Sequence, residues 1–269
     1  MSLPSPAFLE RCRAAAEAAA EAAGKVTTGY FRQDLTVDSK SDESPVTRAD
    51  REAELAVRAV LESQFPDHGV IGEEHGSKDP EAEFVWVIDP IDGTKQFVTG
   101  NVGYGSLIAL AHRGRPVLGL IDMPMKRERW IGLAGRGAVF RDQRGERPAK
   151  VRACAELSQA VLTATTPEMF ASGPRREAFE RLSAEARFTV YGNDCYGFGL
   201  LASGFIDLVC EAALGVYDFM ALAPVITEAG GIITNWRGEP VSLESGDCVI
   251  AAGDQRCHEA ALSILGASA

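Results

Sequence analysis

Residues 84–94 read FVWVIDPIDGT, and this stretch decides the fold and the chemistry that we expect. Its first five residues are apolar and mostly β-branched or aromatic, which is typical of a buried strand. We expect the strand to stop at the acidic segment that follows, because Pro90 fixes its own φ and Gly93 frees the backbone. Asp89 and Asp92 would then lie on one tight loop, with both carboxylates aimed at a common point.

The loop alone leaves two interpretations of this aspartate pair open. Carboxylates that come close repel each other unless a proton or a cation lies between them. Mg²⁺ prefers a few carboxylates together with water and substrate phosphate, so the pair suits a magnesium site. An aspartate at a strand end also often forms an Asx turn before a glycine, and such a turn needs no metal.

The composition is that of an ordinary globular protein and excludes several classes of function. Of the 269 residues, 46% are hydrophobic and 24% charged, which is enough for a substantial core in one unit or two packed halves. The net charge of −11 argues against nonspecific binding to nucleic acid or to an anionic membrane surface. No apolar run approaches the roughly 20 residues that span a bilayer.

The cysteines and the N-terminal stretch indicate a reducing compartment. The six cysteines are scattered without C-x-x-C spacing, which predicts reduced core thiols rather than a zinc site. Charged residues interrupt the alanine-rich N-terminus, which is typical of an amphipathic helix and not of a signal peptide. We therefore expect a cytoplasmic protein. The four histidines are isolated, and we assign them no chemistry.

The first half of the chain predicts two helices and then an antiparallel meander. The helices are expected over about 7–31 and from a capping pattern at Thr47 and Asp50, after a polar break over 42–45. The residues expected on the apolar side of the second helix are Leu55, Val57, Val60 and Leu61. Strands are predicted at 70–72, 84–88, 107–111, 117–121 and 130–133, joined by glycine- and proline-containing turns.

The second half predicts strands that alternate with helices, which indicates a layered α/β arrangement. The polar segment 141–150 is linker-like, so we place a soft boundary there, between halves 1–145 and 146–269 of one compact unit. The expected strands are 161–164, 188–191, 207–210, 232–234 and 249–252, and the expected helices are 175–186, 195–202, 218–228 and one from about 256.

Three motifs together resemble the inositol monophosphatase family, and the resemblance covers nearly the whole chain. They are GEE at 72–74, WVIDPIDGT at 86–94, and YD at 217–218 followed by EAGG at 228–231. Their order and spacing make the match far more specific than a lone DxxD. The resemblance implies an α/β sandwich of the inositol monophosphatase/fructose-bisphosphatase type, with alternating helix and sheet layers and a metal site between the halves.

The resemblance also implies a ligand set for two or three Mg²⁺ ions, with Li⁺ as an inhibitor. Glu73 resembles the metal-binding glutamate of the family, and Asp89 and the backbone carbonyl of Ile91 resemble its loop ligands. Asp92 resembles the bridging aspartate, and Asp218 the ligand from the second half. For Asp218, a role as a helix cap remains an equal alternative. One of the two glutamates at 73–74 is expected to be merely solvated.

Further roles transfer to the residues around the loop. Gly93 and Thr94 match the pair whose backbone N–H groups hold the phosphate at a helix start. Thr94 and Asp50 resemble the hydroxyl–carboxylate pair that, with Glu73, orients and deprotonates the attacking water. Asp50 also fits a capping box without any catalytic role. The implied activity is Mg²⁺-dependent hydrolysis of a phosphate monoester.

The substrate is less strongly indicated. The segments 94–100, 192–196 and 217–224 look more like the histidinol-phosphate phosphatases of the family, which act late in histidine biosynthesis. That substrate carries an ammonium and an imidazole, so Asp194 and Glu211 are candidate substrate ligands, with Asn193 beside them. Asp194 fits a helix cap equally well, Glu211 fits an inositol hydroxyl, and Asn193 fits a turn.

Other functions remain as alternatives. An enzyme for inositol, sugar or nucleotide phosphates would share the metal residues, although no clear basic or stacking cluster favours a nucleotide. A non-catalytic interaction protein with the same fold is a remote alternative, because the metal and water-activating positions are all present. The resemblance further implies a homodimer that acts on a small phosphate ester, with no nucleic-acid or membrane partner.

Overall fold

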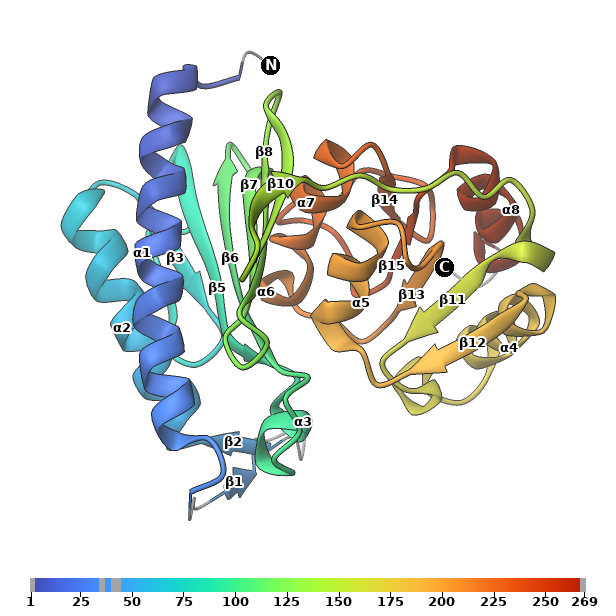
Figure 1. Ribbon diagram of the computed structural model, residues 1–269, viewed down its shortest axis with the longest axis horizontal. Helices are drawn as coiled ribbons and strands as arrows, with labels where there is room; N and C mark the ends of the chain where they lie inside the picture. The colour runs from blue at the N-terminus through green and yellow to red at the C-terminus, as the bar shows by residue number, and fades with distance from the viewer. Residues whose placement is uncertain (1–2, 34–36, 40–44, 267–269) are drawn as a thin grey trace.

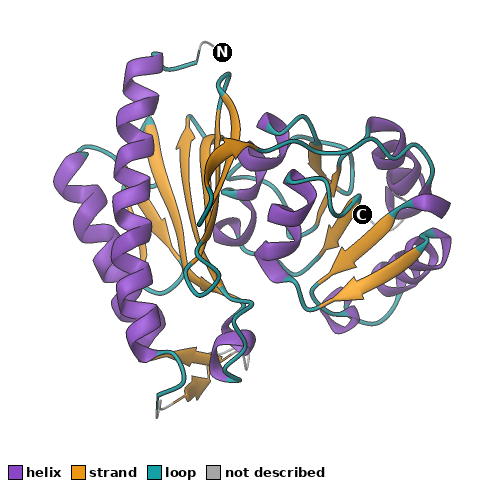
Figure 2. Ribbon diagram, viewed as in Figure 1, coloured by secondary structure: helices purple, strands orange, loops and turns teal. Residues whose placement is uncertain are grey.

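The computed structural model describes residues 3–33, 37–39 and 45–266, and in these residues three layers of helix alternate with two sheets (Figure 2). This confirms the predicted α/β layered sandwich. The larger sheet runs in the order β10-β9-β8-β7-β6-β5-β3-β4. Its strands are β3 (Gly69–Gly72), β4 (Gly76–Lys78), β5 (Phe84–Asp92), β6 (Gly105–His112), β7 (Arg115–Met123), β8 (Glu128–Leu133), β9 (Gly137–Asp142) and β10 (Gly145–Pro148).

The smaller sheet belongs to the second half of the chain and has the order β12-β11-β13-β15-β14. β11 runs parallel to both β12 and β13, whereas β15 is antiparallel to its two neighbours. Its strands are β11 (Val161–Ala164), β12 (Phe188–Tyr191), β13 (Leu208–Glu211), β14 (Ile232–Asn235) and β15 (Val249–Ala252), and a separate pair is β1 (Val37–Ser39) with β2 (Pro45–Thr47).

Helices cover the outer faces of both sheets and fill the space between them (Figure 1). One outer layer is α1 (Pro6–Tyr30) with α2 (Arg48–Gln64), and the other is α4 (Pro174–Glu185) with α8 (Gln255–Leu265). The middle layer is α5 (Asp194–Ala202), α6 (Val216–Phe219) and α7 (Leu222–Glu228). Shorter elements are α3 (Thr94–Val98) and the 3₁₀ turns η1 (Leu157–Gln159) and η2 (Pro167–Phe170).

The first outer layer forms as the sequence predicts, with one exception. Alanines of α1 pack against α2, and Thr47 and Asp50 form the predicted capping box at the start of α2. Val57 and Leu61 are buried as expected, but Leu55 is 52% exposed, so its predicted apolar contact is wrong. Leu55 lies two residues from Val57, about 200° around the helix, and therefore points away from the sheet. Most of the polar break at 42–45 lies outside the described residues.

The expected linker at 141–150 is wrong, because β9 and β10 form a hairpin that extends the larger sheet. The polar residues that suggested a linker make its cross-strand contacts. Both guanidinium nitrogens Nη1 and Nη2 of Arg147 donate to Asp142, at 3.0 and 2.8 Å, and Arg147 lies over the ring of Phe140. The boundary drawn between 145 and 146 thus falls inside β10.

The two halves meet where α7 packs on the larger sheet. A Cβ built on Gly119 of β7 would lie 1.9 Å from the carbonyl oxygen of Ala221, and one on Gly132 of β8 would lie 2.2 Å from that of Pro224. Glycine is therefore required at both positions, because backbone meets backbone with no room for a methyl group. The predicted single helix over 218–228 is instead α6 and α7, which meet at this contact.

Two further expectations concern thiols and membranes. All six cysteines are free, and each is buried except Cys154, which is half-buried. Within the described ranges, the structure contains no helix that is both long enough and apolar enough to cross a bilayer.

Candidate active site

The acidic loop is a continuation of β5. The strand was expected to stop at Ile88, but it pairs with β6 as far as Asp92, with a register irregularity between Asp89 and Asp92. The backbone N–H of Ile91 donates to Asp89 Oδ1 at 3.0 Å, so the Asx turn does form. The irregularity allows both aspartates to point out of the sheet toward one place.

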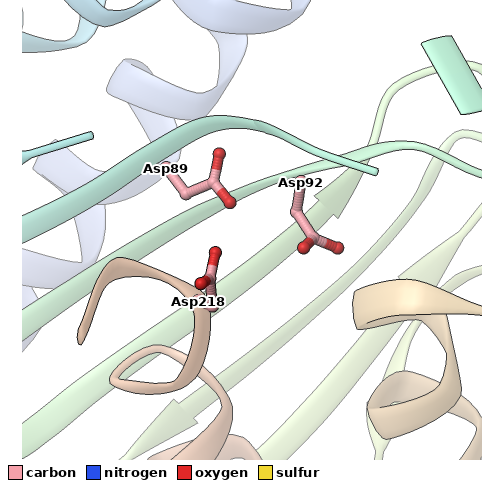
Figure 3. A group of neighbouring side chains, drawn as sticks. All are labelled: Asp89, Asp92 and Asp218. Atoms are coloured by element: carbon pink, nitrogen blue, oxygen red, sulfur yellow. The ribbon is translucent and has the colours of Figure 1, made fainter. Parts of the chain in front are cut away.

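That place also receives Asp218, from the second half of the chain. Each of Asp89, Asp92 and Asp218 offers a carboxylate oxygen within 4.8 Å of the others, and Figure 3 shows the three side chains converging. Asp218 is the third residue of α6, and the N–H of Gly215 donates to its Oδ2 at 2.6 Å. It therefore caps a helix and joins the cluster, so the two roles left open for it do not exclude each other.

Burial and mutual repulsion disfavour the charged forms of these carboxylates. Burial, followed by the charges of Glu73 and Asp92, raises the pKa of Asp89 well above its usual value. Burial, Asp92 and Glu73 do the same to the pKa of Asp218. Burial and then Asp194 raise the pKa of Asp92 to about 7. Crowded, desolvated oxygen ligands of this kind fit a hard divalent cation, which would remove the repulsion.

Glu73 adjoins this cluster from the turn between β3 and β4, and its charge acts on Asp89 and Asp218. Its backbone N–H donates to the carbonyl of Ile88 at 3.2 Å, which ties the turn to the strand that carries Asp89. The neighbouring Glu74 instead acts on Asp50, whose pKa is raised mainly by burial and further by the charge of Glu74. Both glutamates are half-buried and face acidic partners, so neither is the solvated residue expected from the sequence.

Asp50 and Thr94 have different hydrogen-bond partners. Asp50 is buried, and its Oδ2 accepts from the backbone and hydroxyl of Thr47, at 2.8 and 2.6 Å. Burial raises the pKa of Asp50 to about 6 although these bonds lower it. The hydroxyl of Thr94 donates to the carbonyl of Ile91 at 3.1 Å. Asp50 and Thr94 are thus each held by a contact of their own, and their joint role implied by the resemblance stays a prediction.

Gly93 turns the chain from β5 into α3. It has φ 80° and ψ 44°, a left-handed conformation that glycine adopts at little cost. Its carbonyl accepts from the N–H of Phe97 at 3.0 Å and so begins α3. Gly93 and Thr94 therefore stand at the start of a short helix directly after the clustered aspartates, as the sequence predicts.

A second acidic group lies next to the first. The N–H of Cys195 donates to Asp92 Oδ2 at 2.7 Å, which places the start of α5 against the loop. A Cβ built on Gly93 would lie 3.4 Å from Asp194 Cγ. Burial raises the pKa of Asp194 although contacts from Gln96 and Thr165 lower it, and Asp194 Oδ2 is buried without a hydrogen-bond partner in the described chain.

Glu211 adjoins this second group from the end of β13. Its Oε1 accepts from the backbone and hydroxyl of Thr165, at 2.9 and 3.1 Å. Its Oε2 is buried and, among the described residues, has no hydrogen-bond partner. Burial and then the charge of Asp194 raise the pKa of Glu211 well above its usual value. Asn193, by contrast, donates to the hydroxyl of Thr163 at 2.9 Å and anchors α5 to β11.

Sequence reasoning missed Glu54, which supports the turn of Glu73 from α2. Glu54 is fully buried and follows Asp50 by four residues, so both lie on the same helix face. An acidic residue between Ala53 and Val57 on a buried face was the signal that could have identified it. Thr165, which bonds to Glu211, offered no such signal.

A model of the inositol monophosphatase family matches residues 9–268. The chain belongs to the inositol monophosphatase family. It is 44% identical over 266 residues to a protein of Arabidopsis thaliana named bifunctional phosphatase IMPL2, chloroplastic, covering 96% of this chain and 75% of that protein. It is 40% identical over 208 residues to the histidinol-phosphatase of Mycobacterium tuberculosis, covering 76% and 79%.

A solved structure confirms the fold of the family. The inositol monophosphatase from Zymomonas mobilis superposes with a TM-score of 0.86 and 40% identity, covering 98% of this chain and 100% of that chain. Family membership indicates that the chain is a phosphatase. The acidic cluster lies at the end of β5, where the segment DPIDGT begins with Asp89 and includes Asp92.

Proposed function

We propose that this protein is a Mg²⁺-dependent phosphate monoester hydrolase whose substrate is histidinol phosphate. The proposal depends most on one observation: Asp194 and Glu211 each keep a buried carboxylate oxygen that has no hydrogen-bond partner in the described part of the chain, beside the cluster of Asp89, Asp92 and Asp218. Buried acceptors of this kind are costly unless a ligand satisfies them. A substrate with both a phosphate and an ammonium group has the matching charges.

The acidic cluster is the proposed magnesium site. The proposed ligands of two or three ions are Asp89, Asp92, Asp218, Glu73 and the carbonyl of Ile91. The carbonyl of Ile91 accepts a bond from Thr94 and keeps a second lone pair for an ion. Bound Mg²⁺ would supply Lewis-acid stabilisation of the charge that develops on the phosphate. Lithium would then inhibit by competing for the same oxygen ligands.

The remaining chemistry is assigned to residues around the cluster. Glu73 faces the cluster and would accept the proton of the attacking water, while Asp50 and the hydroxyl oxygen of Thr94 would orient that water. The backbone at Gly93 and Thr94 would hold the phosphate at the start of α3. These assignments follow family motifs that match residue by residue.

Asp194 and Glu211 would bind the ammonium group of the substrate. Both belong to the second half of the chain, and burial followed by the charge of Asp194 raises the pKa of Asp92 and that of Glu211. A bound ammonium would remove this repulsion and satisfy both free oxygens. Asn193 is already engaged with Thr163, so its contribution would be to hold α5 in position.

The direct test is phosphate release from histidinol phosphate and from inositol 1-phosphate, measured side by side with Mg²⁺ and with EDTA. We expect EDTA-sensitive hydrolysis with a strong preference for histidinol phosphate. Preference for inositol 1-phosphate would keep the metal site and contradict the ammonium pocket. Hydrolysis of neither ester, or of sugar or nucleotide phosphates only, would contradict the proposed substrate, and inactivity on all of them would favour a non-catalytic protein.

Hydrolysis of inositol 1-phosphate is the second candidate activity. The solved relative from Zymomonas mobilis is an inositol monophosphatase at 40% identity, the same identity as the histidinol-phosphatase from Mycobacterium tuberculosis. Glu211 could accept a hydrogen bond from an inositol hydroxyl, but Asp194 would then add an unbalanced charge. The two unpartnered oxygens together favour the cationic substrate.

The proposed homodimer would form through β12. This strand is the edge of the smaller sheet, and its side chains Phe188, Val190 and Tyr191 are exposed. An apolar edge with unpaired backbone groups is a template for pairing, and a second copy can pair with it antiparallel. Light scattering should give the mass of a dimer, and Val190→Lys should give that of a monomer.

A further inference from the structure

We propose that Glu54 of α2 is a positioning residue for the magnesium site, acting through the turn that carries Glu73. This inference rests on the proposed metal site. Glu54 is fully buried, yet its carboxylate bonds to backbone N–H groups of the turn between β3 and β4. None of the sequence motifs includes it, and it lies outside the three-aspartate cluster.

The turn has three consecutive backbone anchors. The N–H of Glu73 donates to Ile88 of β5 at 3.2 Å. The next two N–H groups, those of Glu74 and His75, donate to Glu54 at 2.6 and 3.2 Å. The peptide that carries Glu73 is thus held on one side by the strand of Asp89 and on the other by α2.

Arg58 completes the anchor. Its Nε donates to Glu54 Oε1 at 2.7 Å, and its Nη2 donates to the carbonyl of Gly76 at the far end of the turn. Arg58 therefore fixes the direction of the Glu54 carboxylate and also contacts the turn itself. A buried charge needs such a partner, since an unpaired carboxylate would be strongly disfavoured.

The Glu54 carboxylate packs directly against the backbone of β3. A Cβ built on Gly72 would lie 2.1 Å from Glu54 Oε1 and 2.7 Å from Arg58 Nη2, so the strand before the turn must be bare at this position. Asp50 lies one turn earlier on the same face of α2, where its Oδ2 accepts from the backbone and hydroxyl of Thr47. One helix face therefore holds Asp50 directly and orients Glu73 through Glu54.

The functional consequence is that Glu54 would raise the magnesium affinity of the site without itself coordinating an ion. Without the two N–H bonds to Glu54 the turn would keep the bond from the Glu73 N–H to Ile88 but lose its anchor on α2, and the Glu73 carboxylate would be directed less firmly at the cluster. Partners that orient a metal ligand typically contribute 10- to 100-fold to metal affinity. We therefore expect Glu54 to act on magnesium affinity more than on substrate binding.

The test is Glu54→Gln, which keeps the size of the side chain but replaces one acceptor oxygen by an NH₂ donor and removes the charge beside Arg58. We expect Mg²⁺ binding, measured by calorimetry on the intact protein, to weaken by about tenfold or more. The Mg²⁺ concentration for half-maximal hydrolysis should rise by the same factor, with the KM for substrate at saturating Mg²⁺ little changed.

Asp207→Asn is the matched control. Asp207 is a similarly buried carboxylate, held by Arg152 and by the N–H of Val161, and it precedes β13 at the end of the strand opposite Glu211. This control should lose stability but keep the wild-type Mg²⁺ affinity. Equal Mg²⁺ affinity in Glu54→Gln and wild type would overturn the inference, and so would an equal loss in the control, because the effect would then reflect general destabilisation.

Arg58→Lys provides the test if Glu54→Gln does not fold. A lysine keeps the positive charge but cannot reach Glu54 and Gly76 with a planar fork. Its Mg²⁺ affinity should fall severalfold, and an unchanged affinity would again overturn the inference. If the wild-type protein itself neither binds Mg²⁺ nor hydrolyses a phosphate ester, the proposed function fails, independently of Glu54.

Discussion

Asp89 and Asp207 are both 1% exposed, and their surroundings are opposite. Asp207, just before β13, accepts from Arg152 Nε and Nη2, both at 2.6 Å, and from the N–H of Val161 at 2.8 Å. Asp89, in β5, accepts from the N–H of Ile91, and its charged neighbours are acidic. The protein thus supplies a cation to one buried carboxylate and acidic neighbours to the other.

The difference separates structural from functional burial. A buried carboxylate with a bidentate arginine is neutralised within the fold and helps to fix the first loop of the second half. A buried carboxylate among other carboxylates destabilises the fold until a cation or a proton arrives. The same residue type at the same burial therefore predicts opposite responses to substitution and to Mg²⁺.

The largest expected effect is on turnover. Asp89→Asn should lower kcat by about a thousandfold or more, because several kcal/mol of transition-state stabilisation depend on the metal. Steady-state kinetics at saturating Mg²⁺ measure this, with Asp207→Asn as the control that keeps most of its activity. An Asp89→Asn or Asp92→Asn enzyme with wild-type turnover would refute the metal-site assignment.

The next expected effect is on stability. Asp207→Asn should be more harmful to stability than Asp89→Asn, which is the reverse of their effects on turnover. Asp207→Asn should destabilise the protein by about 2–3 kcal/mol, since a buried charge-assisted pair is broken. Asp89→Asn should stabilise the metal-free protein by about 1 kcal/mol, because repulsion in the cluster is relieved. Denaturant unfolding in EDTA measures both, and a loss of stability in Asp89→Asn would contradict the comparison.

Magnesium should stabilise the protein through the cluster of Asp89 and not through Asp207. A ligand that binds the native state at a hundred times its Kd stabilises it by about 2.7 kcal/mol. Saturating Mg²⁺ should therefore raise the Tm of wild type and of Asp207→Asn by several degrees, and that of Asp89→Asn by much less. Thermal unfolding with Mg²⁺ and with EDTA tests this, and equal shifts in all three proteins would place the ion elsewhere.

The smallest expected effect concerns the second acidic group. Asp194→Asn should raise the KM for histidinol phosphate about tenfold, the worth of one charge-assisted contact, with a smaller change in kcat. The Mg²⁺ dependence should stay near that of wild type. An unchanged KM would remove Asp194 from the substrate pocket and leave the metal site intact.

Much of this site could be predicted from the sequence, because its residues lie in short continuous motifs. The DPIDGT segment contains Asp89, Asp92 and the turn at Gly93 within a few residues, so local backbone rules suffice. Asp218 was linked to them only by resemblance, since no local pattern brings α6 to β5. The structure makes that contact across the two halves.

The parts that could not be predicted depend on tertiary contacts. The hairpin of β9 and β10 has polar side chains because it is an exposed edge, so its pattern does not differ from that of a linker. Glu54 has no local signature, because its partners are backbone N–H groups about twenty residues later in the chain. Burial of such a carboxylate is decided only when the turn packs on α2.

The backbone-to-backbone contacts at Gly119 and Gly132 have a consequence for the activity of this enzyme. Ala221 follows Asp218 by three residues, and its carbonyl lies against Gly119 with no side chain between them. A single methyl group there would push the segment of Asp218 away from Asp89 and Asp92. The affinity of the proposed magnesium site should therefore depend on how closely the two halves pack. Substitutions at Gly119 or Gly132 should change activity although neither residue contacts an ion or the substrate.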